Sequence, residues 1–185
     1  RSELEKENLI TDLIAAREAL HYEATHDGLS GIWNRSAILD ILHRELCRAQ
    51  RETIPLGVVI GDVDYFKEIN DRHGHLAGDA VLRELARRIA SNIRPYDSVG
   101  RYGGEEFILV LPNCDKNNAR KMADRLRRSF PSRPMETAEG NFYVTMSFGI
   151  SAYDGKGACD VDTMIREADE ALYRAKNLGR NRVEI

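Results

Sequence analysis

The sequence predicts an α/β protein of the α+β kind, with a mainly antiparallel central sheet flanked by helices and an extra N-terminal helix. Residues 56–62 form a short apolar run, which is typical of a buried central strand. Residues 99–102 and 107–111 have the pattern of two further strands joined by a glycine-containing turn. Apolar residues recur at helical spacing before, between and after these strands.

The first 24 residues contain neither glycine nor proline and are predicted to be helical. Leu9, Leu13, Ala16 and Leu20 follow the spacing of a coiled-coil seam. Two interpretations follow. The helix packs on its own domain, or it is the end of a signalling helix that pairs with a second subunit and leads back to an upstream sensor or receiver domain. We therefore expect two parts, the helix over 1–24 and one domain over 25–185.

The elements expected in the domain follow one another in a recognisable order. Helix 36–51 precedes strand 56–62, and a glycine break at Gly74 to Gly78 precedes a helix from about Ala80. Gly103-Gly104 is expected to form a two-residue hairpin turn with positive φ angles. Asp115 is expected to cap the next helix, and strand 142–150, a helix around 164–175 and a terminal strand at 182–185 complete the chain. The central order β-α-β-β-α-β is that of a ferredoxin-like core.

Composition excludes several classes of protein. The chain has 185 residues, 42% hydrophobic and 31% charged, so it is long enough and apolar enough to form a folded core. Its formal net charge of −3 argues against binding a nucleic acid polymer or an anionic membrane surface. Three scattered cysteines fit a reducing cytoplasm. No apolar run approaches the roughly 20 residues that span a bilayer, so we expect no membrane insertion by this segment. The expected location is cytoplasmic, alone or as the cytoplasmic part of a larger, membrane-tethered signalling protein.

Two acidic pairs are candidates for chemistry. Asp62 and Asp64 lie where the first buried strand ends, and buried carboxylates are costly unless something positive compensates them. Oxygen ligands of this kind suit Mg²⁺, although helix capping or ion pairing would also explain them. Glu105 and Glu106 follow the hairpin glycines, and strand alternation suggests that only one of them faces Asp62. Two solvated glutamates on a turn are the alternative.

Several motifs together resemble the GGDEF family of diguanylate cyclases. They are Asp27–Arg35, Asp62–Asp71 with Gly74-His75 and Gly78-Asp79, Gly103-Gly104-Glu105-Glu106-Phe107, and Tyr173–Asn181. The third is the glutamate form of the signature for which the family is named, and the match covers roughly residues 24–185. The opening motif departs from the family pattern in having Ser30 where threonine is usual.

The resemblance implies an enzyme that joins two GTP molecules into cyclic di-GMP and releases two diphosphates. It implies that Asp62, the Val63 carbonyl and Glu105 hold Mg²⁺, with Mn²⁺ as an alternative ion. Glu105 would accept the proton from the attacking hydroxyl, with Glu106 sharing the catalytic or metal role. Lys67 would stabilise charge on the phosphates.

The resemblance also implies a set of substrate-binding residues. They are the Phe66 and Lys67 backbone N–H groups for phosphate, Asn70 and Asp79 for guanine, Gly103 and Gly104 in the turn, and Lys176 and Arg180 for the terminal phosphates. The structural alternatives are an N-cap role for Asp79 and helix C-terminal cations for Lys176 and Arg180.

A second site is implied by Arg94 and Asp97, in a motif that five residues separate from Gly103. In the family an Arg-x-x-Asp sequence at this spacing marks an inhibitory site for the product, cyclic di-GMP, and Arg125 aligns with a further arginine of that site. The reaction implies a homodimer, because each domain contributes half of a site with one GTP. The alternative function is a catalytically silent module that binds GTP or cyclic di-GMP as an effector.

Overall fold

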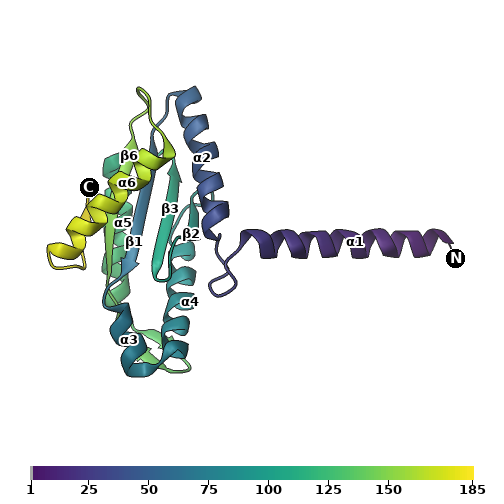
Figure 1. Ribbon diagram of the computed structural model, residues 1–185, viewed down its shortest axis with the longest axis horizontal. Helices are drawn as coiled ribbons and strands as arrows, with labels where there is room; N and C mark the ends of the chain where they lie inside the picture. Colours follow the sequence, from purple (N-terminus) through teal and green to yellow (C-terminus); the bar gives the residue numbers. More distant parts are fainter. Residues whose placement is uncertain (1) are drawn as a thin grey trace.

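Figure 1 shows the computed structural model, which describes residues 2–185, as a sheet covered by helices, with one helix projecting from its side. The helices are α1 (Ser2–Thr25), α2 (Arg35–Glu52), α3 (Phe66–His73), α4 (His75–Ser91), α5 (Lys116–Ser132) and α6 (Val161–Asn177). The strands are β1 (Leu56–Val63), β2 (Ser98–Arg101), β3 (Glu106–Pro112), β4 (Met135–Thr137), β5 (Gly140–Phe142), β6 (Met146–Tyr153) and β7 (Val183–Glu184).

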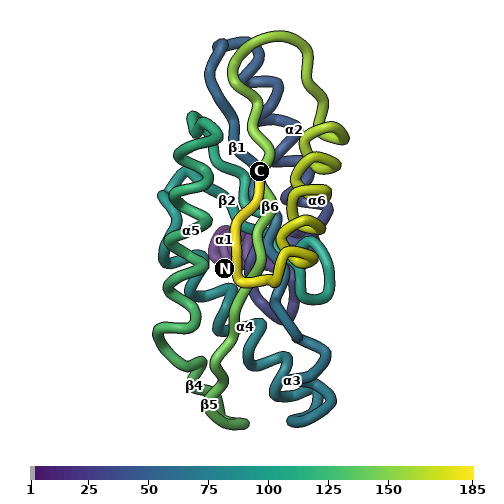
Figure 2. The backbone as a smooth tube through the Cα atoms, turned by 90° about the vertical axis from the view of Figure 1, so that its left-hand side faces the viewer, coloured from purple at the N-terminus to yellow at the C-terminus, as the bar shows by residue number. Residues whose placement is uncertain are grey.

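The main sheet has the strand order β2-β3-β1-β6-β7, with β1 in the centre. β1 pairs antiparallel with β3 and β6, and β7 lies parallel to β6. In Figure 2 the C-terminal segment runs along β6 between α5 and α6. The predicted β-α-β-β-α-β core and its mainly antiparallel sheet are confirmed.

Both faces of β1 are buried, because side chains alternate along a strand and helices cover each face. Val59 packs into an apolar cluster with residues of α4 and α5, whereas Val58 and Ile60 pack into a second cluster with residues of α2 and α6. This burial explains why residues 56–62 read as a continuous apolar run. Because β1 is packed on both faces, the residues that directly follow it have a fixed position at the end of the sheet.

Two expectations about local structure are wrong. The helix expected from about Ala80 begins at His75, directly after the short helix α3. Gly74 separates the two helices with a φ of 86°, whereas Gly78 lies buried inside α4. A Cβ atom on Gly78 would collide with Oδ1 of Asn70, so this glycine permits close packing of α4 on α3 and does not break a helix.

The strand expected over 142–150 is two strands. β5 ends at Phe142 and pairs with β4 in a separate hairpin, and β6 begins at Met146. The intervening Thr145 still accepts a hydrogen bond from the Asp64 backbone N–H, at 2.9 Å. The apolar pattern continues through both strands because Phe142, Val144 and Met146 all face the core.

Helix α1 extends away from the sheet and its helices (Figure 1). The seam residues Leu9, Leu13 and Leu20 are 66–68% exposed, so the interpretation in which this helix packs on its own domain is wrong. The base of the helix is anchored by His26, whose ring stacks on Tyr22 at 3.8 Å and lies 4.4 Å from the Trp33 ring. Pairing of the seam with a second chain stays a prediction. Between residues 2 and 185, no helix is both long and apolar enough to cross a membrane.

Candidate functional site

Acidic side chains from neighbouring strands meet at the end of β1. Asp62 is 6% exposed and lies directly opposite Glu106 on β3 and Ser147 on β6. Residues opposite each other in an antiparallel pair project to the same face, so the Asp62 and Glu106 side chains are neighbours. The predicted convergence of Asp62 with the glutamate pair is therefore present in the fold.

The turn between β2 and β3 differs from the one expected. Tyr102 and Gly103 both donate backbone hydrogen bonds to the Glu106 carbonyl, at 2.8 and 3.3 Å, so the loop is longer than a two-residue hairpin. Neither Gly103 nor Gly104 has a positive φ. A Cβ atom on Gly103 would collide with the Glu106 carboxylate, so a larger residue there would force that side chain to shift.

A salt bridge between Arg101 and Asp27, which both lie outside the turn, helps to hold the turn in place. The guanidinium of Arg101, at the end of β2, donates to the Gly104 carbonyl at 2.8 Å and to the Asp27 carboxylate at 3.2 Å. Asp27 also accepts hydrogen bonds from the Ser30 backbone and hydroxyl, at 2.8 and 2.6 Å. Sequence reasoning assigned no role to Arg101 or Asp27, because 74 residues separate them and nothing local to either one indicates the pair.

Glu106 lies opposite Asp62 in the sheet, and the charge of Asp62 also affects Glu105, so both glutamates are electrostatically coupled to Asp62. The expectation that only one of them faces Asp62 stays a prediction. Glu105 lies in the turn before β3 begins, where strand alternation does not apply. Burial, and then the negative charge of Asp62, raises the pKa of Glu105. Burial also raises the pKa of Asp62 and of Glu106, and each is further raised by a neighbouring carboxylate. Burial thus disfavours the charged form of all three carboxylates gathered here.

The compensating cation is Lys176, in the last turn of α6. Its Nζ donates to Oδ2 of Asp62 at 2.8 Å, and this contact lowers the pKa of Asp62 against the larger effect of burial. The family resemblance implies that Lys176 binds phosphate, whereas in the structure its partner is the predicted metal ligand Asp62.

The donor set at this point fits a hard divalent cation. Asp62 and Glu105 offer carboxylate oxygens, and the Val63 N–H donates to the Glu105 carbonyl at 3.2 Å, which ties the two segments together. Across the described chain, no three histidine, cysteine or acidic side chains form a closed metal site. An ion held here would therefore take further ligands from a bound substrate, which is usual for Mg²⁺.

The start of α3 lies next to this acidic cluster. Tyr65 has a left-handed φ of 56°, and α3 begins at Phe66, so the first N–H groups of the helix, including those of Phe66 and Lys67, lack intrahelical partners. The Lys67 side chain is exposed, and the Arg180 guanidinium lies 4.7 Å from the centre of the Tyr65 ring. Unpaired N–H groups and two cations suit an anionic ligand.

The residues predicted to bind guanine lie on α3 and α4, the two helices that Gly74 separates. Asn70 is in α3, and its Oδ1 is buried without a hydrogen-bond partner among residues 2–185. Asp79 lies in the second turn of α4 and is half-buried, so its alternative role as an N-cap is wrong. A buried acceptor without a donor is costly, and a ligand that donates to Asn70 would remove that cost.

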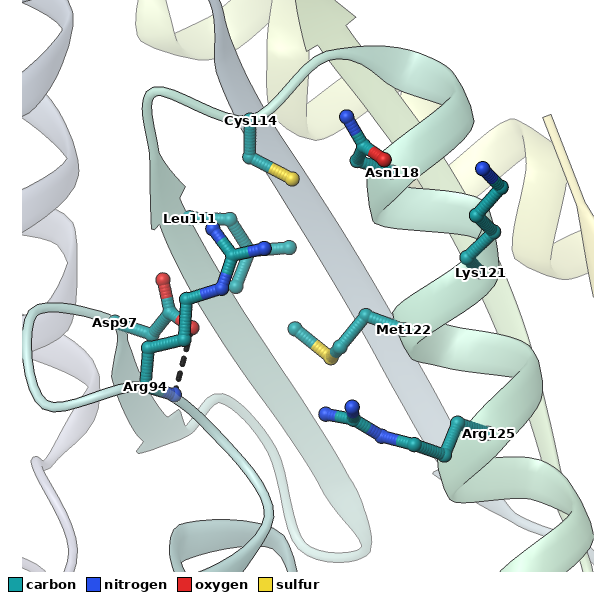
Figure 3. A pocket seen from close by; sticks show the side chains of 8 residues that line it. All are labelled: Arg94, Asp97, Leu111, Cys114, Asn118, Lys121, Met122 and Arg125. Atoms are coloured by element: carbon teal, nitrogen blue, oxygen red, sulfur yellow. Dashed lines mark hydrogen bonds between the residues drawn. The ribbon is translucent and has the colours of Figure 1, made fainter.

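Arg94, Asp97 and Arg125 come together around a separate cavity of about 360 Å³ (Figure 3). Arg94 and Asp97 lie on the turn before β2, where the Arg94 N–H donates to the Asp97 carboxylate at 2.9 Å. Arg125 reaches the cavity from α5. The remaining lining residues, which the sequence analysis missed, are Leu111, Cys114, Asn118, Lys121 and Met122.

Charge and burial give this cavity a defined character. Two guanidinium groups and the Lys121 ammonium line it together with the Asp97 carboxylate, whose pKa is raised by burial. Burial raises the pKa of Cys114 to about 11, so its thiol stays protonated. A ligand with both anionic groups and N–H donors would match this lining.

Comparison with known proteins places these features in one family. The family model described as diguanylate cyclase, GGDEF domain, matches residues 24–182. Diguanylate cyclase DosC of Escherichia coli K12 is 41% identical over 168 residues, and response regulator PleD of Caulobacter vibrioides is 40% identical over 162. These matches cover 91% and 86% of this chain but 36% of each relative, so the chain spans about a third of their length.

Solved structures show the same fold. The coiled coil and GGDEF domain of DgcB from Caulobacter crescentus, in complex with c-di-GMP, superposes with a TM-score of 0.89 at 29% identity. That alignment covers 97% of this chain and 95% of that one. The active GGEEF domain of a diguanylate cyclase from Vibrio cholerae gives a TM-score of 0.76 at 38% identity, over 82% of this chain and 96% of that one.

Proposed function

This chain belongs to the GGDEF family, and we propose that it is a diguanylate cyclase domain that condenses two GTP molecules into cyclic di-GMP and two diphosphates. The observation that carries the proposal is the meeting of Asp62 with Glu105 and Glu106 beside the free N-terminus of α3. In this reaction the 3′-hydroxyl of one GTP attacks the α-phosphate of the other. Such a reaction depends mainly on positioning and on neutralising phosphate charge.

Asp62, the Val63 carbonyl and Glu105 would hold Mg²⁺, or Mn²⁺ in its place. The ion supplies positive charge to the phosphates and lowers the pKa of a nearby hydroxyl. Burial and mutual repulsion raise the pKa values of Asp62 and Glu105. A bound dication would relieve that repulsion, so these carboxylates suit a metal ion.

Glu105 is the proposed proton acceptor for the attacking hydroxyl. The charge of Asp62 acts on the Glu105 carboxylate, which places Glu105 beside the proposed ion and the hydroxyl whose pKa the ion would lower. Glu106, whose side chain projects to the same face of the sheet as that of Asp62, would share the catalytic or metal-binding role.

Phosphate would be bound by the Phe66 and Lys67 N–H groups, the Lys67 ammonium, Lys176 and Arg180. Gly103 and Gly104 would let the turn approach the nucleotide. Lys176 would exchange its contact with Asp62 for one with phosphate when the substrate and its ion are bound. This exchange keeps the charge of the site balanced in both states.

Asn70 and Asp79 would read guanine. The carboxylate of Asp79 can accept from the N1–H and N2–H groups that adenine lacks as a pair, and the unpaired Oδ1 of Asn70 can accept one more hydrogen bond.

A dimer is required by the proposed chemistry, because one domain supplies half of the site. The exposed seam of α1 is the proposed pairing surface, and an upstream sensor or receiver domain would control it. Cyclic di-GMP is the proposed inhibitor at Arg94, Asp97 and Arg125, where the cavity offers cations for phosphate and a carboxylate for guanine. The bound c-di-GMP in the DgcB complex supports product binding by a relative of this fold.

The experiment is a product assay. The purified chain is incubated with GTP and Mg²⁺, and nucleotides are identified by chromatography and mass. Glu105→Ala is compared with Glu139→Ala, which removes an exposed glutamate from the β4–β5 turn. We expect cyclic di-GMP that rises more steeply than linearly with protein concentration, is lost in Glu105→Ala and persists in Glu139→Ala. Nucleotide binding without product, even in artificially joined subunits, would favour the silent effector module.

A further inference from the structure

Asp64 is the acid of the Asp62-Val63-Asp64 segment for which the proposed chemistry has no use. Its side chain is 5% exposed. Its Oδ2 accepts hydrogen bonds from the Thr145 hydroxyl at 2.7 Å and from the Asn181 backbone N–H at 3.0 Å, and its Oδ1 accepts from the Ser147 hydroxyl at 2.7 Å. Both oxygens are thus occupied by protein donors, which distinguishes Asp64 from Asp62.

The hydrogen bond from the Asn181 N–H connects Asp64 to a strained segment of backbone. Arg180 and Asn181 have φ angles of 62° and 45°, so two consecutive residues other than glycine adopt the left-handed conformation. This conformation is unfavourable for residues with a Cβ atom and persists only where surrounding contacts enforce it.

Contacts from four elements enforce it here. The Arg180 N–H donates to the Ala175 carbonyl of α6 at 3.0 Å, and Asp64 accepts from the Asn181 N–H. The Arg127 guanidinium of α5 donates to the Asn181 carbonyl at 3.2 Å, and the next carbonyl accepts from Phe148 of β6 at 2.9 Å. Of the side chains among these contacts, Asp64 is the buried one, and it alone comes from the strand end that carries the acidic cluster.

The strained pair places a side chain at the candidate site. The Arg180 guanidinium lies 4.7 Å from the centre of the Tyr65 ring, over the start of α3. Tyr65 is itself left-handed and directly follows Asp64. Asp64 is therefore connected to both partners of this stack, to Tyr65 as its neighbour in the chain and to Arg180 through the hydrogen bond from the Asn181 N–H.

We propose that Asp64 is a positioning residue which holds the Arg180–Asn181 turn so that Arg180 stands over the start of α3, where the triphosphate of GTP binds. The inference rests on the proposed function, which assigns phosphate binding to Arg180. It assigns to the second aspartate a role through backbone geometry and not through a metal ion.

The asparagine variant separates these two roles. An amide oxygen in place of Oδ2 would still accept from Thr145 and Asn181, and an amide NH₂ in place of Oδ1 would donate to the Ser147 hydroxyl, which can accept. Asp64→Asn therefore keeps the positioning network but removes the charge. Asp64→Ala removes the network and leaves the Asn181 N–H unpaired.

The test is the affinity of the full chain, with Mg²⁺ present, for a GTP analogue with a methylene group between the α- and β-phosphates, measured by titration calorimetry. We expect Asp64→Ala to weaken binding about tenfold, the scale of one lost charge-assisted hydrogen bond. Asp64→Asn should remain within about threefold of the unmodified chain. Asp64→Ala combined with Arg180→Ala should bind no more weakly than Arg180→Ala alone, because both changes remove the same contact.

The outcomes that overturn the inference are distinct from failure of the proposed function. Additive losses in the double variant, or an Asp64→Asn loss as large as that of Asp64→Ala, would show that Asp64 does not act through Arg180. Unchanged affinity in Arg180→Ala would overturn both the phosphate role of Arg180 and this inference. Absence of binding by the unmodified chain would overturn the proposed function itself.

A stability control keeps the result interpretable. Asp115→Ala removes the N-cap of α5, where the carboxylate accepts from the Asn118 N–H at 2.8 Å, and should lower stability without changing analogue affinity. Amide hydrogen exchange at Asn181 supplies a direct readout. Protection should fall in Asp64→Ala and persist in Asp64→Asn. Equal protection in all three chains would overturn the inference, and the Asp64→Asn comparison decides it even if Asp64→Ala does not fold.

Discussion

The Lys176 ammonium lies 2.8 Å from Oδ2 of Asp62, so the lysine near the C-terminus of α6 is the counterion of the central carboxylate of the sheet. Asp62 is 6% exposed, and a buried charge without a partner is strongly unfavourable. In the chain without a bound ion, Lys176 therefore stabilises the same carboxylate that is proposed to hold Mg²⁺.

Lys176→Met should destabilise the metal-free chain by about 1–2 kcal/mol, a value reduced from that of a fully buried pair because Lys176 is one-third exposed. The difference from the unmodified chain should be largest at neutral pH and should shrink as pH falls through the raised pKa of Asp62, which lies above the ordinary aspartate value of 3.8, because protonated Asp62 needs no counterion. Urea unfolding at several pH values measures it, with the exposed Lys156→Met as control. A loss that is equal at every pH would contradict this explanation.

Glu105→Gln should abolish product formation and stabilise the metal-free chain. The raised pKa of Glu105 means that the folded state binds its proton more tightly than the unfolded state does. Its contribution to stability therefore falls as pH rises from the ordinary value of 4.5 through the raised one. Removing the ionisable group should then add about 0.5 kcal/mol at neutral pH, a small value because the side chain is only partly buried.

Thermal unfolding with and without Mg²⁺ checks this prediction. The stabilising effect of Mg²⁺ on the unmodified chain should be weaker in Glu105→Gln, because the ion loses a ligand. Lower stability of Glu105→Gln at neutral pH in the metal-free state would contradict the charge argument.

Arg94→Ala should weaken the binding of cyclic di-GMP about tenfold to a hundredfold, because the proposed contact of its guanidinium with the ligand is lost from a cavity of about 360 Å³. Inhibition of GTP turnover by added cyclic di-GMP should shift to higher concentration by a similar factor. The control is Arg120→Ala, which removes an exposed cation of α5 that does not line the cavity. Equal inhibition of the two variants would place the inhibitory site elsewhere.

The sequence alone predicted the core order and the meeting of Asp62 with a glutamate of the Glu105-Glu106 pair, because both depend on strand burial and on short-range motifs. It did not predict the longer β2–β3 turn or the Arg101–Asp27 salt bridge, since these depend on contacts between residues far apart in the chain. The β4–β5 hairpin was not predicted, for another reason. Its apolar residues continue the pattern of β6, so periodicity alone does not show where one strand ends.

Gly78→Ala separates local helix preference from close packing. Alanine inside a helix is favoured over glycine by about 1 kcal/mol, so propensity alone predicts a more stable α4. The added Cβ would, however, collide with Oδ1 of Asn70 and lie 3.0 Å from the Phe66 ring. We expect it to displace Asn70 and to weaken binding of the GTP analogue about tenfold, the scale of one lost hydrogen bond to a buried group.

The same titration with the matching ATP analogue tests the assignment to guanine. If Asn70 reads the base, Gly78→Ala should reduce the preference for GTP over ATP, whereas a purely structural effect would lower both affinities equally. Gly28→Ala is the control, because a Cβ atom there meets nothing within 4 Å. An unchanged preference, together with a gain in stability, would mean that α4 accommodates the methyl group and that Asn70 does not contact the base.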